Sequence, residues 1–102
     1  MLAKVKMAKR ISTTVFDPEL LDLIAAAIAD LKLIGIEFNV TEVKTQGVVT
    51  DYTITDPLIS RAITTYVVMN FGSPDDYDRL KESYDEQKGQ LRETSGYGLE
   101  VL

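Results

Sequence analysis

The chain has 102 residues, of which 45% are hydrophobic, and this is enough to form one domain around a single core. It contains no histidine and no cysteine, which excludes Ser/His/Asp and Cys/His nucleophiles, zinc sites with thiolate or imidazole ligands, and disulfides. The net charge of −5 argues against tight, sequence-independent binding to a nucleic-acid backbone, and no apolar run approaches the roughly 20 residues that cross a bilayer. We therefore expect a soluble intracellular protein with no membrane segment, no metal and no cofactor.

A short amphipathic helix is predicted over residues 1–11. Its apolar residues recur at Leu2, Val5 and Ala8, which places them on one face and the lysines on the outer face. The polar residues 12–14 end this helix.

Each of the three prolines follows a residue that commonly caps a helix N-terminus. Proline is tolerated at the first helical position because its missing N–H had no partner there, and an Asp or Ser side chain accepts from the next free N–H groups. The sequence therefore predicts three helix starts, at Asp17-Pro18, Asp56-Pro57 and Ser73-Pro74.

The second helix is predicted over residues 18–34, with Gly35 as the residue that ends it. Its other side, away from the core, carries the small residues Ala25, Ala26 and Ala29. Helix propensity alone explains alanine there, but small side chains would also let a second helix approach closely, as a subunit contact requires. Apolar residues at 3.6-residue spacing form its core stripe: Leu20, Leu21, Ile24, Ala27, Ile28, Leu31 and Ile34.

Residues 36–55 change to the two-residue period of β-strands. The pattern predicts a β-hairpin with a four-residue loop, residues 44–47, and Gly47 at its positive-φ position. Because an isolated hairpin is marginal in water, it must pack on the helices or pair with a neighbouring chain. The alternating apolar residues are Ile36, Phe38 and Val40 before the loop, and Val48, Tyr52 and Ile54 after it.

The third helix is predicted over residues 57–71 and is the expected centre of the core. Its apolar face is broad, and Val68 lies almost opposite that face. A helix that is apolar on more than one side is central or shared between partners. The face comprises Ile59, Ala62, Ile63, Tyr66, Val67 and Asn70, widened by Leu58 and Met69.

The fourth helix is predicted over residues 74–94 and has a thin apolar stripe of Tyr77, Leu80, Tyr84 and Leu91. Four apolar side chains cannot bury every side of a helix that is roughly 30 Å long. Residues 95–102 are expected to form a flexible tail. This tail either frays or becomes ordered on a partner.

The charge is unevenly distributed along the chain. Residues 1–10 contain four cations and no acid, whereas residues 75–86 contain six acids and two cations. The two segments are either solvated faces or complementary surfaces that attract copies of the chain head to tail, an attraction that would steer assembly more than tighten it.

These elements predict a single mainly α domain over residues 1–102, a small bundle of three to four helices with a β-hairpin inserted between the second and third. Its second half carries, in order, Asp56-Pro57-Leu58-Ile59-Ser60-Arg61-Ala62-Ile63, Tyr66-Val67, Asn70-Phe71-Gly72, Asp76, Arg79-Leu80, Ser83-Tyr84, Lys88, Leu91 and Ser95-Gly96-Tyr97. Its first half carries Val5-Lys6, Lys9-Arg10-Ile11, Phe16-Asp17, Glu19-Leu20, Leu23-Ile24, Ala26-Ala27 and Asp30-Leu31.

In this order and spacing, the motifs resemble the head–tail connector (adaptor, or head completion) family of tailed bacteriophages and prophages. The likeness covers about four-fifths of the chain, but residues 37–55 match nothing in the family, where this connection is often shorter. The resemblance implies a structural virion protein with no enzymatic activity. It would assemble in the host cytoplasm as a homo-oligomeric, dodecameric ring beneath the portal protein, in the virion neck. The ring would extend the channel for DNA after packaging and offer a platform to the next neck or tail protein.

The resemblance also implies where partners bind. The family docks onto the portal through its C-terminal part, which by position points to Leu80, Tyr84, Leu91, Tyr97 and Leu99. On this reading, Tyr84→Ala leaves the fold intact and weakens portal docking. Lys44 at the hairpin tip is the candidate that faces the channel. A ring built from copies of one chain also needs two different, complementary surfaces on each subunit. The candidates for the subunit interface are Ala25, Ala26, Ala29 and Val68.

A small helix-turn-helix DNA-binding regulator is the alternative function, with the third helix as recognition helix. That helix offers few polar side chains that could reach bases, and its connection from the second helix is some 20 residues long rather than a tight turn. An enzyme is a more distant alternative, because no pair of acids lies in an evidently apolar segment.

Overall fold

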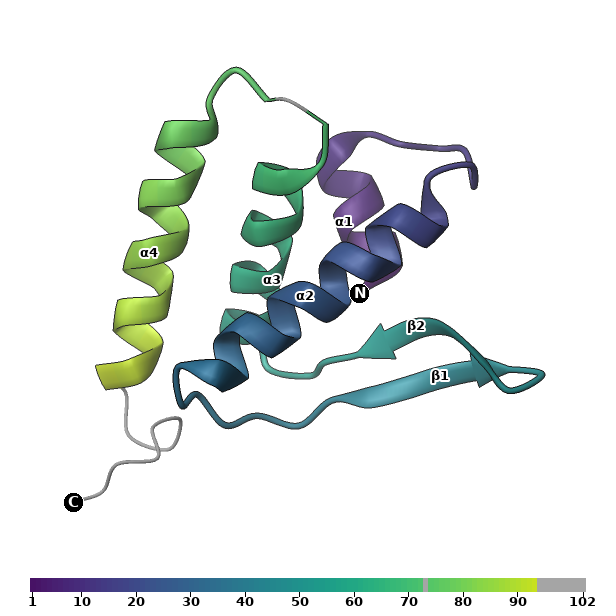
Figure 1. Ribbon diagram of the computed structural model, residues 1–102, viewed down its shortest axis with the longest axis horizontal. Coiled ribbons are helices and arrows are strands. Elements are labelled where there is room, and N and C mark those ends of the chain that lie inside the picture. The colour runs from purple at the N-terminus through teal and green to yellow at the C-terminus, as the bar shows by residue number, and fades with distance from the viewer. Residues whose placement is uncertain (73, 94–102) are drawn as a thin grey trace.

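The computed structural model describes residues 1–72 and 74–93, and Figure 1 shows how its helices and strands are arranged. The fold is mainly α, with an antiparallel two-stranded hairpin between the second and third helices. This confirms the fold class predicted from the sequence. The elements are α1 (Leu2–Lys9), α2 (Asp17–Leu33), β1 (Thr41–Thr45), β2 (Val48–Thr53), α3 (Pro57–Asn70) and α4 (Tyr77–Glu93).

α3 is the central helix of the molecule. It packs against α1, α2 and α4, and α4 and α1 lie on opposite sides of it, with α2 crossing in front (Figure 1). The apolar residues on more than one side of α3 account for this position.

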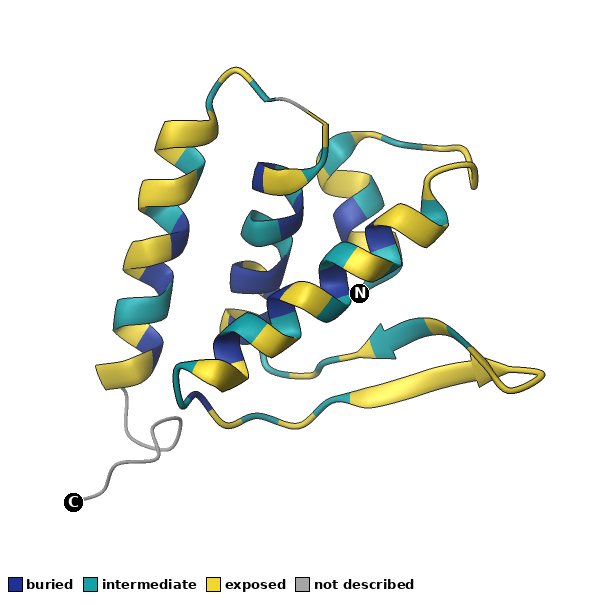
Figure 2. Ribbon diagram, in the orientation of Figure 1, coloured by how far each residue is buried: buried dark blue, intermediate teal, exposed yellow. Residues whose placement is uncertain are grey.

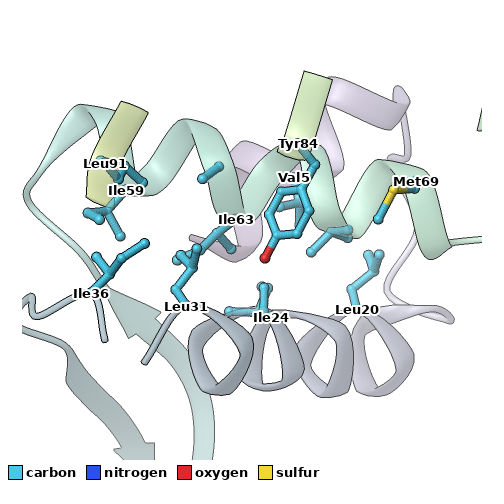
Figure 3. Packing of buried hydrophobic residues seen from close by; sticks show 13 residues of the cluster. Val5, Leu20, Ile24, Leu31, Ile36, Ile59, Ile63, Met69, Tyr84 and Leu91 are labelled. Atoms are coloured by element: carbon cyan, nitrogen blue, oxygen red, sulfur yellow. The ribbon is translucent and has the colours of Figure 1, made fainter. Parts of the chain in front are cut away.

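One hydrophobic core joins the four helices and the segment that follows α2 (Figure 3). Within residues 1–72 and 74–93, α1 contributes one buried apolar side chain, Val5, and α4 contributes two, Tyr84 and Leu91. The two outer helices are therefore held by few side chains, whereas α2 and α3 supply most of the core. The buried apolar residues are Val5, Leu20, Ile24, Ala27, Leu31, Ile36, Ile59, Ala62, Ile63, Val67, Met69, Tyr84 and Leu91.

The predicted helix caps have different outcomes. Asp56 caps α3 as predicted, because its carboxylate accepts from the backbone N–H groups of Leu58 (2.9 Å) and Ile59 (3.4 Å). The prediction for α2 is wrong: the helix begins at Asp17 itself, Phe16 takes the cap position, and no side chain bonds there. The predicted cap Ser73 lies outside the described residues.

The carboxylate of Asp17 has a different partner. It lies 2.9 Å from the ammonium group of Lys6 in α1, which ties α1 to the first turn of α2. An acid in the first turn also interacts favourably with the helix dipole. Asp17 therefore stabilises the start of α2 through charge rather than through a cap bond.

The first turn of α4 also differs from the prediction, which began this helix at residue 74. The helix begins at Tyr77, and residues 75–76 form a turn before it. The carbonyl of Asp76 accepts the N–H of Leu80 (3.0 Å), and the Asp76 carboxylate pairs with Arg79. Asp76 is therefore the residue immediately before the helix, and its carbonyl accepts a hydrogen bond from the first helical turn.

The hairpin is shorter than predicted. Residues 36–40 are not part of a strand, and the loop has two residues, Gln46 and Gly47, rather than four. Their φ angles of 54° and 81° are the left-handed values that a type I′ turn needs at both positions. The apolar alternation before β1 has another cause: Ile36 lies in the core, and the Phe38 ring centroid lies 4.6 Å from Lys32 Nζ.

The base of the hairpin is fixed to the helices, and its tip is not. From α1, the Met1 amino group donates to the Tyr52 carbonyl and the Leu2 N–H donates to the Asp51 carboxylate, each at 2.9 Å. From α3, the Ser60 hydroxyl donates to a backbone carbonyl just before that helix (3.3 Å). Every residue of β1 is exposed (Figure 2), and the tip projects beyond the helices (Figure 1). The hairpin is therefore an arm held at one end.

Candidate interaction surfaces

The inner side of α4 is attached to α2 and α3 by a small polar and aromatic cluster. The Tyr84 hydroxyl donates to Asp30 of α2 over 2.6 Å, and its ring packs edge-on against Tyr66 of α3 with centroids 5.4 Å apart. Lys88 lies 3.4 Å from the same Asp30 carboxylate and 4.6 Å above the Tyr84 ring. Burial raises the pKa of the Tyr84 hydroxyl, and its bond to the Asp30 carboxylate raises the pKa further.

Two of the predicted portal-docking residues belong to this attachment. Tyr84 and Leu91 are only 2% and 3% exposed, so in this subunit they position α4 rather than form its surface. Leu80 is half-buried, and Tyr97 and Leu99 lie outside the described residues. A docking role for all five stays a prediction. The expectation that Tyr84→Ala leaves the fold intact no longer holds, because that substitution would empty a core position.

An open groove separates α2 from the hairpin. It has a volume of about 850 Å³, and Ala25 and Ala29 lie along its helical side. Tyr52 and Lys44 lie along its hairpin side, and Lys32 also borders it. The small side chains of these alanines border the open space, and their role in admitting another chain stays a prediction. Nothing in the sequence pattern indicated that the hairpin would form the opposite wall.

The other predicted interface residues lie apart from this groove. Ala26 is exposed on α2, outside the residues that border the groove. Val68 is half-buried on α3. The structure therefore brings Ala25 and Ala29 together at one surface and leaves Ala26 and Val68 elsewhere. Lys44 is exposed on the hairpin, 3.6 Å from the carboxylate of Glu42.

An acidic stripe follows the outer side of α4. Asp78, Glu82 and Glu86 are exposed and spaced four residues apart, which aligns them on one face. Each stands two residues, or about half a turn, from the side chains that face the core, and Figure 2 shows the buried residues of α4 on the side toward α3. Three of the four cations of this helix are paired with other acids: Arg79 with Asp76, Lys81 with Asp85 (3.0 Å) and Lys88 with Asp30 (3.4 Å).

The outer side of α1 has the opposite character. Ala3, Met7 and Ala8 are exposed there, and Met7 is 79% exposed. The exposed cation Lys4 lies among them in the helix, and the exposed Arg10 follows its last residue. This face therefore combines exposed apolar side chains with positive charge.

The comparison with known families identifies the chain. A family model described as phage connector protein matches residues 1–98. The chain belongs to the phage connector protein family. No curated protein and no solved structure matches it.

Membership makes this connector a structural phage protein that associates with other head and tail proteins of the virion. Among residues 1–72 and 74–93, no group of three or more acidic side chains is arranged to hold a metal ion, and no helix is long and apolar enough to cross a membrane.

Sequence reasoning missed the geometry of the connector's charged surface more than its composition. The cluster of acids in residues 75–86 is evident in the sequence. The four-residue spacing of Asp78, Glu82 and Glu86 would also have predicted that these three acids align on one face of the helix. Of the three residues predicted to form the inner face of α1, Leu2, Val5 and Ala8, the last is exposed to solvent. Only Val5 of this helix is buried.

Proposed function

We propose that this connector forms a dodecameric ring between the portal and the next neck or tail protein, and that the ring extends the DNA channel after packaging. Membership in the phage connector family carries this proposal. The subunit has a helical body with two different outer helices and a projecting arm, a shape that suits the heterologous contacts of a ring. A helix-turn-helix regulator has no comparable support, because a hairpin rather than a turn of three to four residues joins α2 to α3.

The C-terminal end of the connector is the part that docks on the portal in this proposal. Tyr97 and Leu99 make the direct contacts, and Leu80 contributes from the half-buried edge of α4. Tyr84 and Leu91 act indirectly, because they are buried and hold α4 against the rest of the subunit.

The hairpin contributes to the channel wall in this proposal, with Lys44 facing DNA. The ammonium group of Lys44 lies 3.6 Å from Glu42 on the same strand, so the arm presents a paired charge rather than a free cation. Binding to DNA strengthens with each unpaired cation of the protein that neutralises a phosphate. A channel lined in this way lets DNA slide through without being held.

Co-elution of the connector with the portal protein of its own genome tests the proposal. We expect the two to elute as one complex on size exclusion and the Tyr97→Ala/Leu99→Ala variant to elute separately. Val15→Ala is the matched control, since Val15 is an exposed apolar residue in the connection between α1 and α2, at the end of α2 remote from the C-terminal end of α4 (Figure 1), and it should still bind. Separate elution of the unmodified proteins at micromolar concentrations would contradict the proposal.

A further inference from the structure

We propose that copies of this connector join head to tail through the outer face of α1 on one copy and the acidic stripe of α4 on the next. The proposal rests on the ring assembly proposed above and specifies the contact that builds it. The occupant of each face is a second copy of this chain.

The acidic stripe lacks a partner within its own subunit. In the part of the chain that the structure describes, no cation pairs with Asp78, Glu82 or Glu86. Like charges four residues apart on a helix repel one another and destabilise it. A cationic surface from outside the subunit would relieve this repulsion, so the stripe is complementary to a basic face.

The α1 face supplies that complement. Lys4 and Arg10 have no acidic partner among the described residues, whereas the neighbouring Lys6 is already paired with Asp17. Beside the two cations lie Ala3, Met7 and Ala8, which expose apolar surface to solvent. Flexible methionine side chains adapt to irregular partner surfaces. The eight residues of α1 and the span from Asp78 to Glu86 have similar lengths of about 12 Å.

The arrangement of the helices prevents the two faces from meeting within one copy. α1 and α4 lie on opposite sides of α3 (Figure 1), and each packs against it. The contact must therefore form between copies, and each addition leaves one face free at either end. Such a heterologous contact continues until the chain of subunits closes into a ring.

Charge reversal on each face tests the contact with the purified full chain. One variant carries Glu82→Lys and Glu86→Lys, and the other carries Lys4→Glu and Arg10→Glu. Sedimentation velocity at about 0.05 M salt, where charges are weakly screened, should show the unmodified chain associating and each variant associating at least roughly tenfold more weakly. An equal mixture of the two variants should associate again, because each reversed face then meets a reversed partner.

Two further variants make the result specific. Asp22→Lys with Glu37→Lys changes the net charge by the same amount as the α4 variant at exposed acids outside the stripe, and this control should associate like the unmodified chain. Because the chain contains no cysteine, a mixture of Lys4→Cys and Glu82→Cys chains should form a disulfide-linked heterodimer under oxidation. A Glu37→Cys chain mixed with Lys4→Cys should not.

The outcomes separate this contact from the ring itself. Association that survives both charge reversals, or that the mixture fails to restore, would overturn the α1–α4 contact while leaving portal co-elution intact. No association of the unmodified chain up to millimolar concentration would also overturn it. A connector that pairs through these faces but does not bind the portal would instead contradict only the proposed function.

Discussion

At the scale of single residues, Asp30 of α2 is the polar group that holds α4 against the other helices. Its carboxylate accepts from the Tyr84 hydroxyl (2.6 Å) and lies 3.4 Å from Lys88. We expect Tyr84→Phe to leave the aromatic side chain in place. It should lower the free energy of unfolding by about 1–2 kcal/mol, because a hydrogen bond to a charged group is lost beside the core. Urea denaturation measures this change.

Tyr77→Phe is the matched control for that substitution. Tyr77 is 40% exposed on the same helix, and exposed substitutions usually change stability by no more than about 0.5 kcal/mol. Equal effects of the two substitutions would show that the bond to Asp30 does not hold α4.

Asp51 provides a test by pH at the residue scale. Burial by itself raises its pKa, but the N–H groups of Leu2 and Tyr52 and the Met1 amino group outweigh burial, and the pKa lies below its ordinary 3.8. A carboxyl group whose pKa is lowered by folding stabilises the native state at pH values above its ordinary pKa. This stabilisation is lost as the pH falls through the native pKa. The stability difference between the unmodified chain and Asp51→Asn should therefore shrink from about pH 6 to about pH 3. Denaturation at both pH values measures it, and a difference that is constant or grows would contradict the account.

At the scale of elements, the type I′ turn controls the arm. Gly47 has a φ of 81°, and a Cβ added there would meet no heavy atom within 4 Å, so Gly47→Ala acts through backbone strain alone. We expect a cost of about 1 kcal/mol and faster amide hydrogen exchange in β1 and β2. The helices should exchange as before, since their contacts with the hairpin are at its base. Faster exchange throughout the protein would show that the arm is part of the cooperative core.

Gly89→Ala should have the opposite effect in α4. Gly89 lies inside the helix, and its added Cβ also meets no heavy atom within 4 Å. Alanine lowers the entropy lost on folding, so we expect stabilisation by about 0.5–1 kcal/mol. Thermal unfolding measures it, and a lower melting temperature would contradict the description of this part of α4.

The elements themselves could be predicted from the sequence where local chemistry decides them. Asp56 and Pro57 gave the start of α3, and the glycine at residue 35, with φ of 95°, gave the end of α2. The strand bounds could not be predicted, because Ile36 and Phe38 alternate for a tertiary reason: they pack on helices. The start of α2 was misplaced for a similar reason, since Lys6 from another helix takes the Asp17 carboxylate.

At the scale of the whole molecule, function depends on which faces the packing leaves outside. The basic and acidic segments were visible in the sequence, but their positions on opposite sides of α3 follow from the order in which helices pack, which periodicity does not specify. The same holds for the groove beside Ala25 and Ala29, whose second wall is the hairpin. Only the chain's family and fold could be predicted with the sequence in hand; its candidate surfaces needed the arrangement in space.

The central claim is that this connector functions as a ring on the portal. Imaging the complex of the connector with the portal protein of its own genome, and counting connector subunits from its rotational symmetry, tests that claim most directly. We predict a closed ring stacked coaxially on the portal, with one connector subunit beside each portal subunit. A complex in which single connector subunits bind without contacting one another, or no complex at all, would contradict it.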